Sequence, residues 1–291
     1  MTALQILVDG FAISALYGLA AVGFTLIFGV SGVLNLAHGG IMVVAAMVGW
    51  WAAGDLGLGV YAGTLVGVLA GLLAAYATYF TVVRPIQRSR AIDQEEKEIF
   101  VLTGTLLFGI MIQTGMAYIF SDNPVTMRPL IGGVINVVSV RTPKNEIMIA
   151  VLCWLVIGLL WLLINRTRAG KSMLAASMNP RGLTLLGVEL SRVYLLVWSL
   201  YGILAGIAGV LLASFLGVST ANVGQLTAIA FSIVVLGGLG SVSGSLIAAF
   251  VVGYLETLTA YLVAPTLRPV PALILLVLVV YLRPQGLLGR R

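Results

Sequence analysis

Long apolar runs, most of them about 20 residues in length, follow one another along almost the whole chain of 291 residues. A helix that crosses the roughly 30 Å hydrocarbon core of a bilayer needs about 20 apolar residues, and only helices and closed barrels satisfy their backbone hydrogen bonds there. The runs therefore predict an all-α fold, a polytopic transmembrane helical bundle that forms one domain over residues 1–291. Two runs are short, 224–238 and 269–282, so we expect about 8–10 spans. The candidate spans are 6–29, 33–53, 58–83, 99–120, 146–164, 193–218, 224–238, 242–263 and 269–282.

The loops between these runs differ in their content of Lys and Arg, the residues that mark cytoplasmic loops. The 84–97 loop has four, the 165–192 loop has five and the C-terminus has three, whereas the 121–145 and 264–268 loops together have four. This division predicts that the 84–97 loop, the 165–192 loop and the C-terminus face the cytoplasm. The N-terminus is then outside and the C-terminus inside. The C-terminal cations are Arg283, Arg290 and Arg291.

The composition narrows the class of protein further. Hydrophobic residues make up 60% of the chain, charged residues only 9%, and the mean hydropathy is +1.11. These values exclude an ordinary soluble enzyme and a disordered protein, and the single cysteine, Cys153, excludes a disulfide-stapled domain. The net charge of +6 lies in short clusters between apolar runs. We therefore expect the lipid bilayer, and no nucleic acid, as a partner.

Catalytic chemistry is poorly represented in the sequence. Gly170-Lys171-Ser172 looks like the end of a Walker A motif, which needs a glycine five residues before Gly170 and a strand ahead of it. Here position 165 is Asn165, and the preceding segment is a membrane span, so the match fails. With a single histidine and a single cysteine, no metal cluster or catalytic triad can be assembled. We therefore expect a protein that has no catalytic residues and no metal site, which leaves transport, channel activity or signalling as its function. The glycine-rich stretch 237–244 departs from the GxGxxG spacing and predicts a tight turn or a helix break.

Polar residues within apolar runs are the candidates for function. Asn35 and His38 lie in GVSGVLNLAHGG, where the chain should be entering the membrane. Such groups usually face the bundle interior, so they either line a transport pathway or cap and brace the start of a helix. Glu256 is the other ionisable group inside a span, and we expect a buried hydrogen bond or an interface position for it. Glycines at helical spacing predict close helix packing within the bundle: Gly63, Gly67, Gly71, Gly202 and Gly206.

The 165–192 segment combines five cations with a short apolar helix pattern at 173–176. Asn179-Pro180 breaks that pattern, which then restarts and ends at Gly187. One interpretation is that the segment is a solvated loop whose cations only set the orientation of the chain in the membrane. Such a loop would need the cations but would not need an ordered apolar face. The segment therefore favours a docking element for a cytoplasmic partner.

Together these residues resemble the membrane permease subunits of ABC importers for branched-chain amino acids, the Liv type. The resemblance covers nearly the whole chain. It is carried by four segments in order: Tyr17–Gly40, Thr167–Val188, Val234–Glu256 and Leu282–Arg290.

The resemblance implies an assembly in a bacterial or archaeal plasma membrane. In it, a second homologous permease completes the translocation pathway, two cytoplasmic ABC ATPases use ATP and Mg, and an extracytoplasmic solute-binding protein delivers the substrate, while this chain itself binds no cofactor. The stretch beside the pathway would be Asn35, Ala37, His38 and Gly39. Residues coupling the chain to the ATPases would be Arg168, Gly170, Lys171, Ala175, Asn179, Leu186 and Gly187.

Two positions depart from the family pattern. Gly40 stands where the family often has an acid after the AHG stretch, so any role of that acid is lost or moved. In the coupling segment, Arg181-Gly182-Leu183 replaces the usual acid-Ala-Ala, which would tune the choice of ATPase.

The expected substrate is a branched-chain or other small hydrophobic amino acid, because helix ends and glycine breaks can meet its charged groups while an apolar wall accepts its side chain. Urea or short amides would be served by the same features. A self-contained secondary transporter or channel is the other alternative, and it would require pairs of acids within the membrane or two matching half-channel motifs. Within the spans only Glu256 stands out as such an acid, so the sequence favours the importer subunit.

Overall fold

The computed structural model describes residues 2–137, 140–283 and 285–288, and most of these are helical. α3 continues through a single π-helical turn, Tyr79–Val83, into α4. Two short 3₁₀ turns, η2 (Thr220–Asn222) and η3 (Pro265–Leu267), precede α10 and α12. The α-helices are α1 (Thr2–Ser31), α2 (His38–Gly54), α3 (Gly59–Thr78), α4 (Arg84–Arg88), α5 (Gln94–Phe120), α6 (Lys144–Arg166), α7 (Arg168–Met178), α8 (Pro180–Leu185), α9 (Leu190–Phe215), α10 (Val223–Gly237), α11 (Val242–Leu262) and α12 (Val270–Leu282).

Eight helical segments of the described residues are long and apolar enough to cross a membrane, and α2 is a shorter apolar helix of 17 residues. The predicted bundle of about 8–10 spans is therefore confirmed. The start of the second span at residue 33 was wrong, because α2 begins at His38. Gly32 has a φ of 67°, a left-handed conformation that ends α1, and residues 32–37 remain non-helical.

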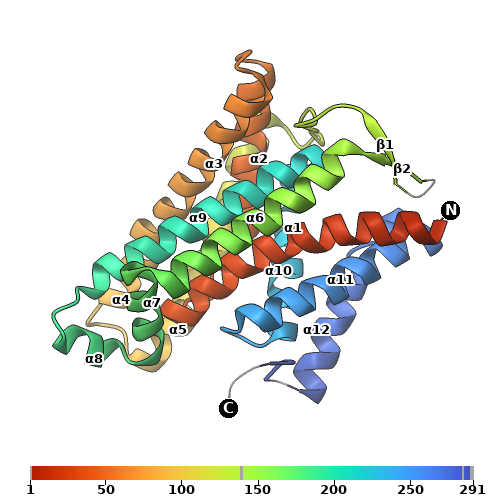
Figure 1. The fold of residues 1–291 in the computed structure, drawn as a ribbon. Helices are drawn as coiled ribbons and strands as arrows, with labels where there is room; N and C mark the ends of the chain where they lie inside the picture. The colour runs from red at the N-terminus through yellow and green to blue at the C-terminus, as the bar shows by residue number, and fades with distance from the viewer. Residues whose placement is uncertain (1, 138–139, 284, 289–291) are drawn as a thin grey trace.

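A small β-hairpin departs from the all-α prediction. Strands β1 (Val134–Val137) and β2 (Val140–Pro143) pair antiparallel, with Val134 opposite Pro143 and Ile135 opposite Thr142. The hairpin belongs to the connection between α5 and α6, away from the centre of the bundle (Figure 1). It adds a short extramembrane element and leaves the helical architecture unchanged.

α1 forms the centre of the bundle and packs against α6, α9, α10 and α11. A second group, α2, α3 and α9, is held together by glycines at the contacts. A Cβ on Gly71 would lie 2.8 Å from the Cα of Gly206, and a Cβ on Gly67 would lie 2.5 Å from the carbonyl oxygen of Ala45. The predicted packing role of the glycines is thus confirmed.

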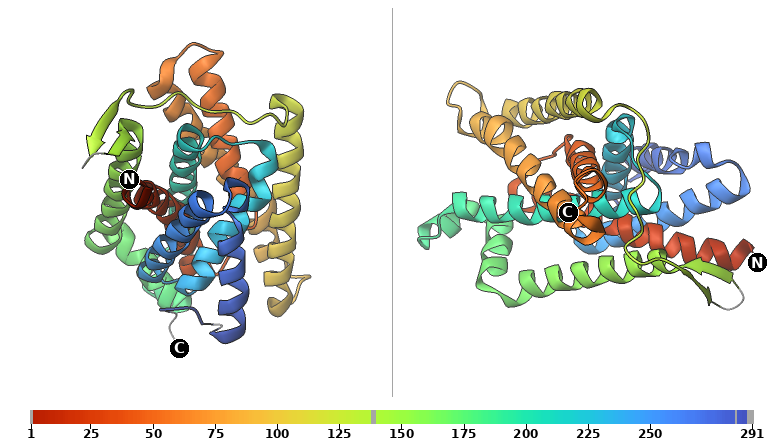
Figure 2. Two further views of the ribbon diagram at one scale, coloured as in Figure 1. Left: turned by 90° about the vertical axis from the view of Figure 1, so that its right-hand side faces the viewer. Right: turned by 90° about the horizontal axis from the view of Figure 1, so that it is seen from above.

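Two helices stand at the edges of the bundle, α5 and α12 (Figure 2). In α12 Ala272 is the one buried residue, and leucine and valine side chains cover the rest of its surface. α5 similarly exposes Leu107, Ile110 and Met111. Such surfaces suit contact with lipid or with another membrane subunit.

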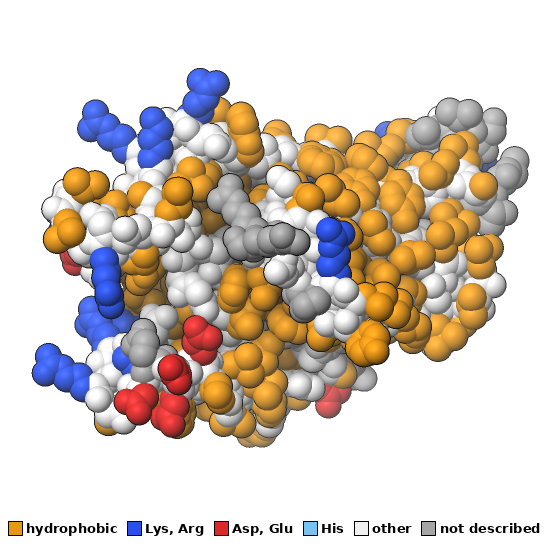
Figure 3. Space-filling model, turned by 90° about the horizontal axis from the view of Figure 1, so that it is seen from below, with side chains coloured by type: hydrophobic (Ala, Val, Ile, Leu, Met, Phe, Trp, Pro, Cys, Tyr) orange, Lys and Arg blue, Asp and Glu red, His pale blue; other side chains and the backbone are white. Residues whose placement is uncertain are grey.

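The two ends of the bundle differ in charge. α4, α7 and α8 lie together at one end, while the N-terminus and the hairpin lie at the other (Figure 1). Lys and Arg side chains gather at the first end, and much of the remaining surface on this face is apolar (Figure 3). Both basic loops of the sequence therefore share one end, which we call the basic end. Of the C-terminal cations, Arg290 and Arg291 lie outside the described residues.

The glycine-rich stretch 237–244 forms the predicted turn between α10 and α11. Gly238 and Gly240 have φ values of 102° and 83°, which other residues rarely adopt. The C-terminal segment packs against this turn, because the backbone N–H of Leu287 donates to the carbonyl of Leu236 at 2.8 Å. Leu287 is thereby fixed to α10.

Candidate functional site: the helix break and the coupling segment

The break between α1 and α2 is held by hydrogen bonds from distant helices. The Asn35 side chain accepts from the backbone N–H of Ala37 at 3.0 Å, and its amide donates to the Tyr201 hydroxyl of α9 at 2.9 Å. The backbone N–H of Leu36 donates to the Thr105 hydroxyl of α5 at 3.1 Å. These bonds satisfy backbone and side-chain groups that the missing helical turn leaves open.

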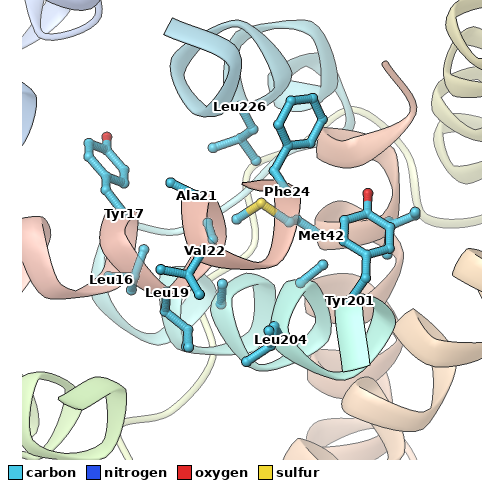
Figure 4. Close-up of a cluster of buried hydrophobic side chains, with 14 of the residues drawn as sticks. Leu16, Tyr17, Leu19, Ala21, Val22, Phe24, Met42, Tyr201, Leu204 and Leu226 are labelled. Atoms are coloured by element: carbon cyan, nitrogen blue, oxygen red, sulfur yellow. The ribbon is translucent and has the colours of Figure 1, made fainter. Parts of the chain in front are cut away.

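His38 is the first residue of α2 and is fully buried. Its Nδ1 lies 3.0 Å from the Tyr201 hydroxyl, which therefore links Asn35 and His38. The ring also contacts Phe24 edge-on, with the centroids 5.2 Å apart. Tyr201 and Phe24 belong to the buried cluster drawn in Figure 4, and Trp198 packs against Tyr201 at 5.6 Å.

Gly39 lies against α10. Its backbone N–H donates to the Thr227 hydroxyl at 2.9 Å, and that hydroxyl in turn donates within α10 to the carbonyl of Val223 at 2.9 Å. A Cβ at position 39 would collide with the same Val223 carbonyl. Only glycine allows this close approach of α2 to α10.

The four sequence-predicted pathway residues, 35 and 37–39, are thus brought together and buried. Asn35 and His38 do brace the start of α2, while a role beside the pathway stays a prediction. The neighbouring residues 32–34 line a cavity of about 620 Å³ at the basic end, together with Gln87 and Tyr194. Sequence reasoning missed the bracing partners Thr105, Tyr201 and Thr227, although a polar residue inside an apolar run was the available signal.

The coupling segment forms two short helices with well-defined ends. The Thr167 side chain accepts from the backbone N–H of Gly170 at 3.0 Å and caps α7. Asn179 does the same for α8, accepting from Gly182 at 2.8 Å, with Pro180 in the first turn. Gly187, with a φ of 79°, closes α8. The helix, break and second helix expected from the sequence are all present.

The proposed coupling residues differ in their burial, and Leu185, next to the proposed Leu186, is exposed as well. Gly170 is buried, and a Cβ there would collide with the carbonyls of residues 163 and 164 at the end of α6, so it positions α7 and does not offer a docking surface. Ala175 is half-buried. The side chains of Leu185 and Leu186 are 88% and 81% exposed at the tip of α8. The other exposed members of the group are Arg168, Lys171, Asn179 and Gly187.

A groove of about 440 Å³ runs between α7 and the start of α9. It is lined by Ser172, Gly187, Glu189 and Arg192 among others. Hydrogen bonding from Ser191, and then the charge of Arg192, lower the pKa of the exposed Glu189 carboxyl, which pairs with Arg192 at 2.7 Å. The groove therefore presents an ion pair at neutral pH beside the leucines of α8.

Glu256 makes the buried hydrogen bond expected for it. Its Oε2 accepts from the Tyr17 hydroxyl at 2.7 Å, between α11 and α1. A second polar contact nearer the N-terminus joins the Tyr261 hydroxyl to the carboxylate of Asp9, which also accepts from Gln5 at 2.9 Å. Both contacts tie α11 to α1 across the bundle.

A bundle of long apolar helices, with a braced helix break inside it and an exposed apolar tip among cations at one end, defines a polytopic membrane transport subunit. Residues 6–282 match the family described as "Branched-chain amino acid transport system / permease component". The chain belongs to this family and is a multi-pass permease subunit of an ABC importer.

Individual relatives are similar over most of the chain. The high-affinity branched-chain amino acid transport system permease protein LivH of Escherichia coli (strain K12) is 27% identical over 297 residues, which cover 99% of this chain and 96% of LivH. BraD of Pseudomonas aeruginosa, named for the same kind of system, is 28% identical with the same coverage. The autoinducer 2 import system permease protein LsrD of Escherichia coli (strain SMS-3-5 / SECEC) is 26% identical over 82% of this chain and 71% of LsrD.

Proposed function

We propose that this permease forms, with a second homologous permease, the pathway by which branched-chain or other small hydrophobic amino acids are imported. The observation that carries the proposal is its similarity to LivH and BraD, whose names give branched-chain amino acids as cargo, along 99% of its length. The low content of fixed charge in the spans agrees with a substrate whose side chain is apolar.

The energy for import comes, in this proposal, from two cytoplasmic ABC ATPases that bind ATP and Mg at the basic end, while this chain binds no cofactor. Exposed Leu185 and Leu186 at the tip of α8 support it, because leucines with so much area in water usually have a partner. A solute-binding protein would then deliver substrate at the opposite end, where the N-terminus lies. This arrangement places the N-terminus outside and the C-terminus in the cytoplasm.

The helix break is proposed as a part of the pathway wall that this chain contributes. Asn35, Ala37, His38 and Gly39 shape the break, and the cavity lined by residues 32–34 begins directly beside it. The side chain of Asn35 is already paired through both its oxygen and its nitrogen, so we expect it to fix the wall and not to bind substrate by itself. His38 is paired only through Nδ1, and its buried Nε2 has no hydrogen-bond partner among the described residues.

A permease for a small uncharged solute such as urea or a short amide is the second candidate. LsrD, which is named for autoinducer 2, is also similar to this chain, so relatives of one fold carry names for different cargo.

Co-purification followed by transport tests the proposal. The tagged chain, gently solubilised from its native membrane, should bring down a second permease and two ATPases in a fixed ratio. The same strain should take up labelled leucine, with valine competing and urea not competing. Recovery of the chain alone, active in liposomes without ATP, would overturn the importer assembly, whereas an intact assembly whose uptake is inhibited by urea alone would favour the second candidate.

A further inference from the structure

A cavity of about 450 Å³ lies at the end of the bundle opposite the basic end. Its wall includes Tyr17 of α1, Leu212 and Leu216 of α9, Gln225 of α10 and Arg268 after η3. The volume falls in the range of about 300–1,000 Å³ that small-molecule sites occupy. Apolar and polar groups from four separate elements therefore converge on one hollow.

Arg268 in the wall of this cavity and Glu256 behind the wall both carry a buried polar atom without a partner in the described part of the chain. The Nε of Arg268 and the Oε1 of Glu256 are both buried and make no hydrogen bond among the described residues. Burying such atoms unpaired is costly, so a site that leaves them unpaired is incomplete without a ligand or water. Glu256 stands directly behind the wall, because the Tyr17 hydroxyl of the lining donates to it at 2.7 Å.

The side chains of the wall suit the carboxylate and the apolar side chain of an amino acid. Arg268 lies in the wall, whereas Glu256 is 0% exposed and is linked to the wall by its hydrogen bond with Tyr17. A guanidinium matches a carboxylate in geometry and charge, and Leu212 and Leu216 add an aliphatic wall beside it. Urea and neutral amides have no carboxylate, so they would gain nothing from the arginine.

Tyr17 and Leu226 also line a small apolar crevice deeper in the bundle. Met42 and Ile233 line the same crevice. In Figure 4 Leu226 and Met42 lie in the same buried cluster as Tyr17. The wall of the cavity is therefore backed by the apolar core of the bundle.

We propose that this cavity is where the solute first binds the permease, and that Arg268 binds its carboxylate while Leu212 and Leu216 receive an aliphatic side chain. Glu256 holds Tyr17 in the wall through their buried hydrogen bond. The inference rests on the proposed function, and it names the chemical class of the cargo: an amino acid with an apolar side chain, bound through its carboxylate.

The transport test uses the complete importer in proteoliposomes with saturating leucine-loaded binding protein. Arg268→Gln should reduce leucine uptake about tenfold or more, the usual effect of losing a hydrogen bond to a charged group, and Arg268→Lys should recover part of it. Arg128→Gln is the matched control, because Arg128 is an exposed arginine of the 121–145 loop, outside this cavity. Uptake by Arg268→Gln at the wild-type rate would overturn the proposal, as would a loss explained entirely by weaker affinity for the binding protein. If the wild-type importer moved no amino acid at all, the proposed function would fail instead.

A labelling test does not depend on transport. The chain has a single cysteine, so Thr266→Cys in a Cys153→Ala background places one reactive thiol on the cavity wall. A negatively charged methanethiosulfonate should react faster than a positively charged one, and Arg268→Gln should abolish that difference. Saturating leucine-loaded binding protein should slow both reactions. Equal rates for the two reagents, unchanged by Arg268→Gln, would show that the arginine does not face the cavity as a free charge and would overturn the assignment.

Discussion

The two leucines at the tip of α8 lead to a quantitative prediction about assembly. Leu186 is 81% exposed, so docking against an ATPase would remove most of its side chain from water. Burying a leucine contributes about 2 kcal/mol, and Leu186→Ala should therefore weaken the binding of the ATPase about 30-fold. The double variant with Leu185→Ala should lose binding further, since Leu185 is equally exposed.

The assay is the amount of ATPase retained by the purified membrane complex as salt and detergent washes are extended, together with ATP hydrolysis stimulated by the loaded binding protein. Because position 186 contacts little within the chain, the variant should fold normally, with a free energy of unfolding changed by less than about 0.5 kcal/mol. Leu262→Ala at the other end, also an exposed leucine, is the matched control. Full retention of the ATPase by the double variant would refute the docking role of α8.

Three further substitutions test the packing around the helix break and the coupling segment. Tyr201→Phe leaves two buried side-chain nitrogens without their partner and should lower the free energy of unfolding by about 1–3 kcal/mol, measured as a lower midpoint of thermal unfolding in detergent. Gly39→Ala should cause loss of the monodisperse protein, because the methyl group would collide with the carbonyl of Val223, whereas Gly54→Ala, with nothing within 4 Å, should behave as wild type. Gly170→Ala should separate α7 from α6 and reduce ATP-driven uptake with the core still folded, seen as normal thermal unfolding with lower uptake.

The sequence was sufficient to predict most of the bundle, because long apolar runs translate directly into helices. The predicted start of α2 was wrong, because Val33 and Leu34 are apolar and were included in the span although they lie in the helix break. The break follows Gly32, whose left-handed backbone conformation is visible only in the structure. The hairpin was missed because its strands have only four residues each, in the connection between two predicted spans. Short strands leave almost no periodic signal.

The candidate site was predictable only in part, for a related reason. Asn35 and His38 stood out as polar residues at a span, but their partner Tyr201 is 166 and 163 residues away in the chain. The same holds for Thr227, which contacts Gly39 across 188 residues. The sequence pattern identifies a polar residue within an apolar run, but it does not show which distant residue will be its hydrogen-bond partner. The two helices of the coupling segment and the break between them, in contrast, followed from local sequence, because caps and breaks are encoded within a few residues.

The hydrogen bonds at the helix break also constrain how this subunit moves. Residues 35–39 are bonded to α5 through Thr105, to α9 through Tyr201 and to α10 through Thr227. A shift of about 1 Å would break these bonds and leave buried polar groups without their partners. We therefore expect α2, α5, α9 and α10 to move as one body during the ATP cycle, with sliding confined to the exposed faces of the subunit. Spin-label distances between the ends of α5 and α9 should be the same with and without ATP in the assembled importer; a change of several ångströms would contradict the rigid-body argument.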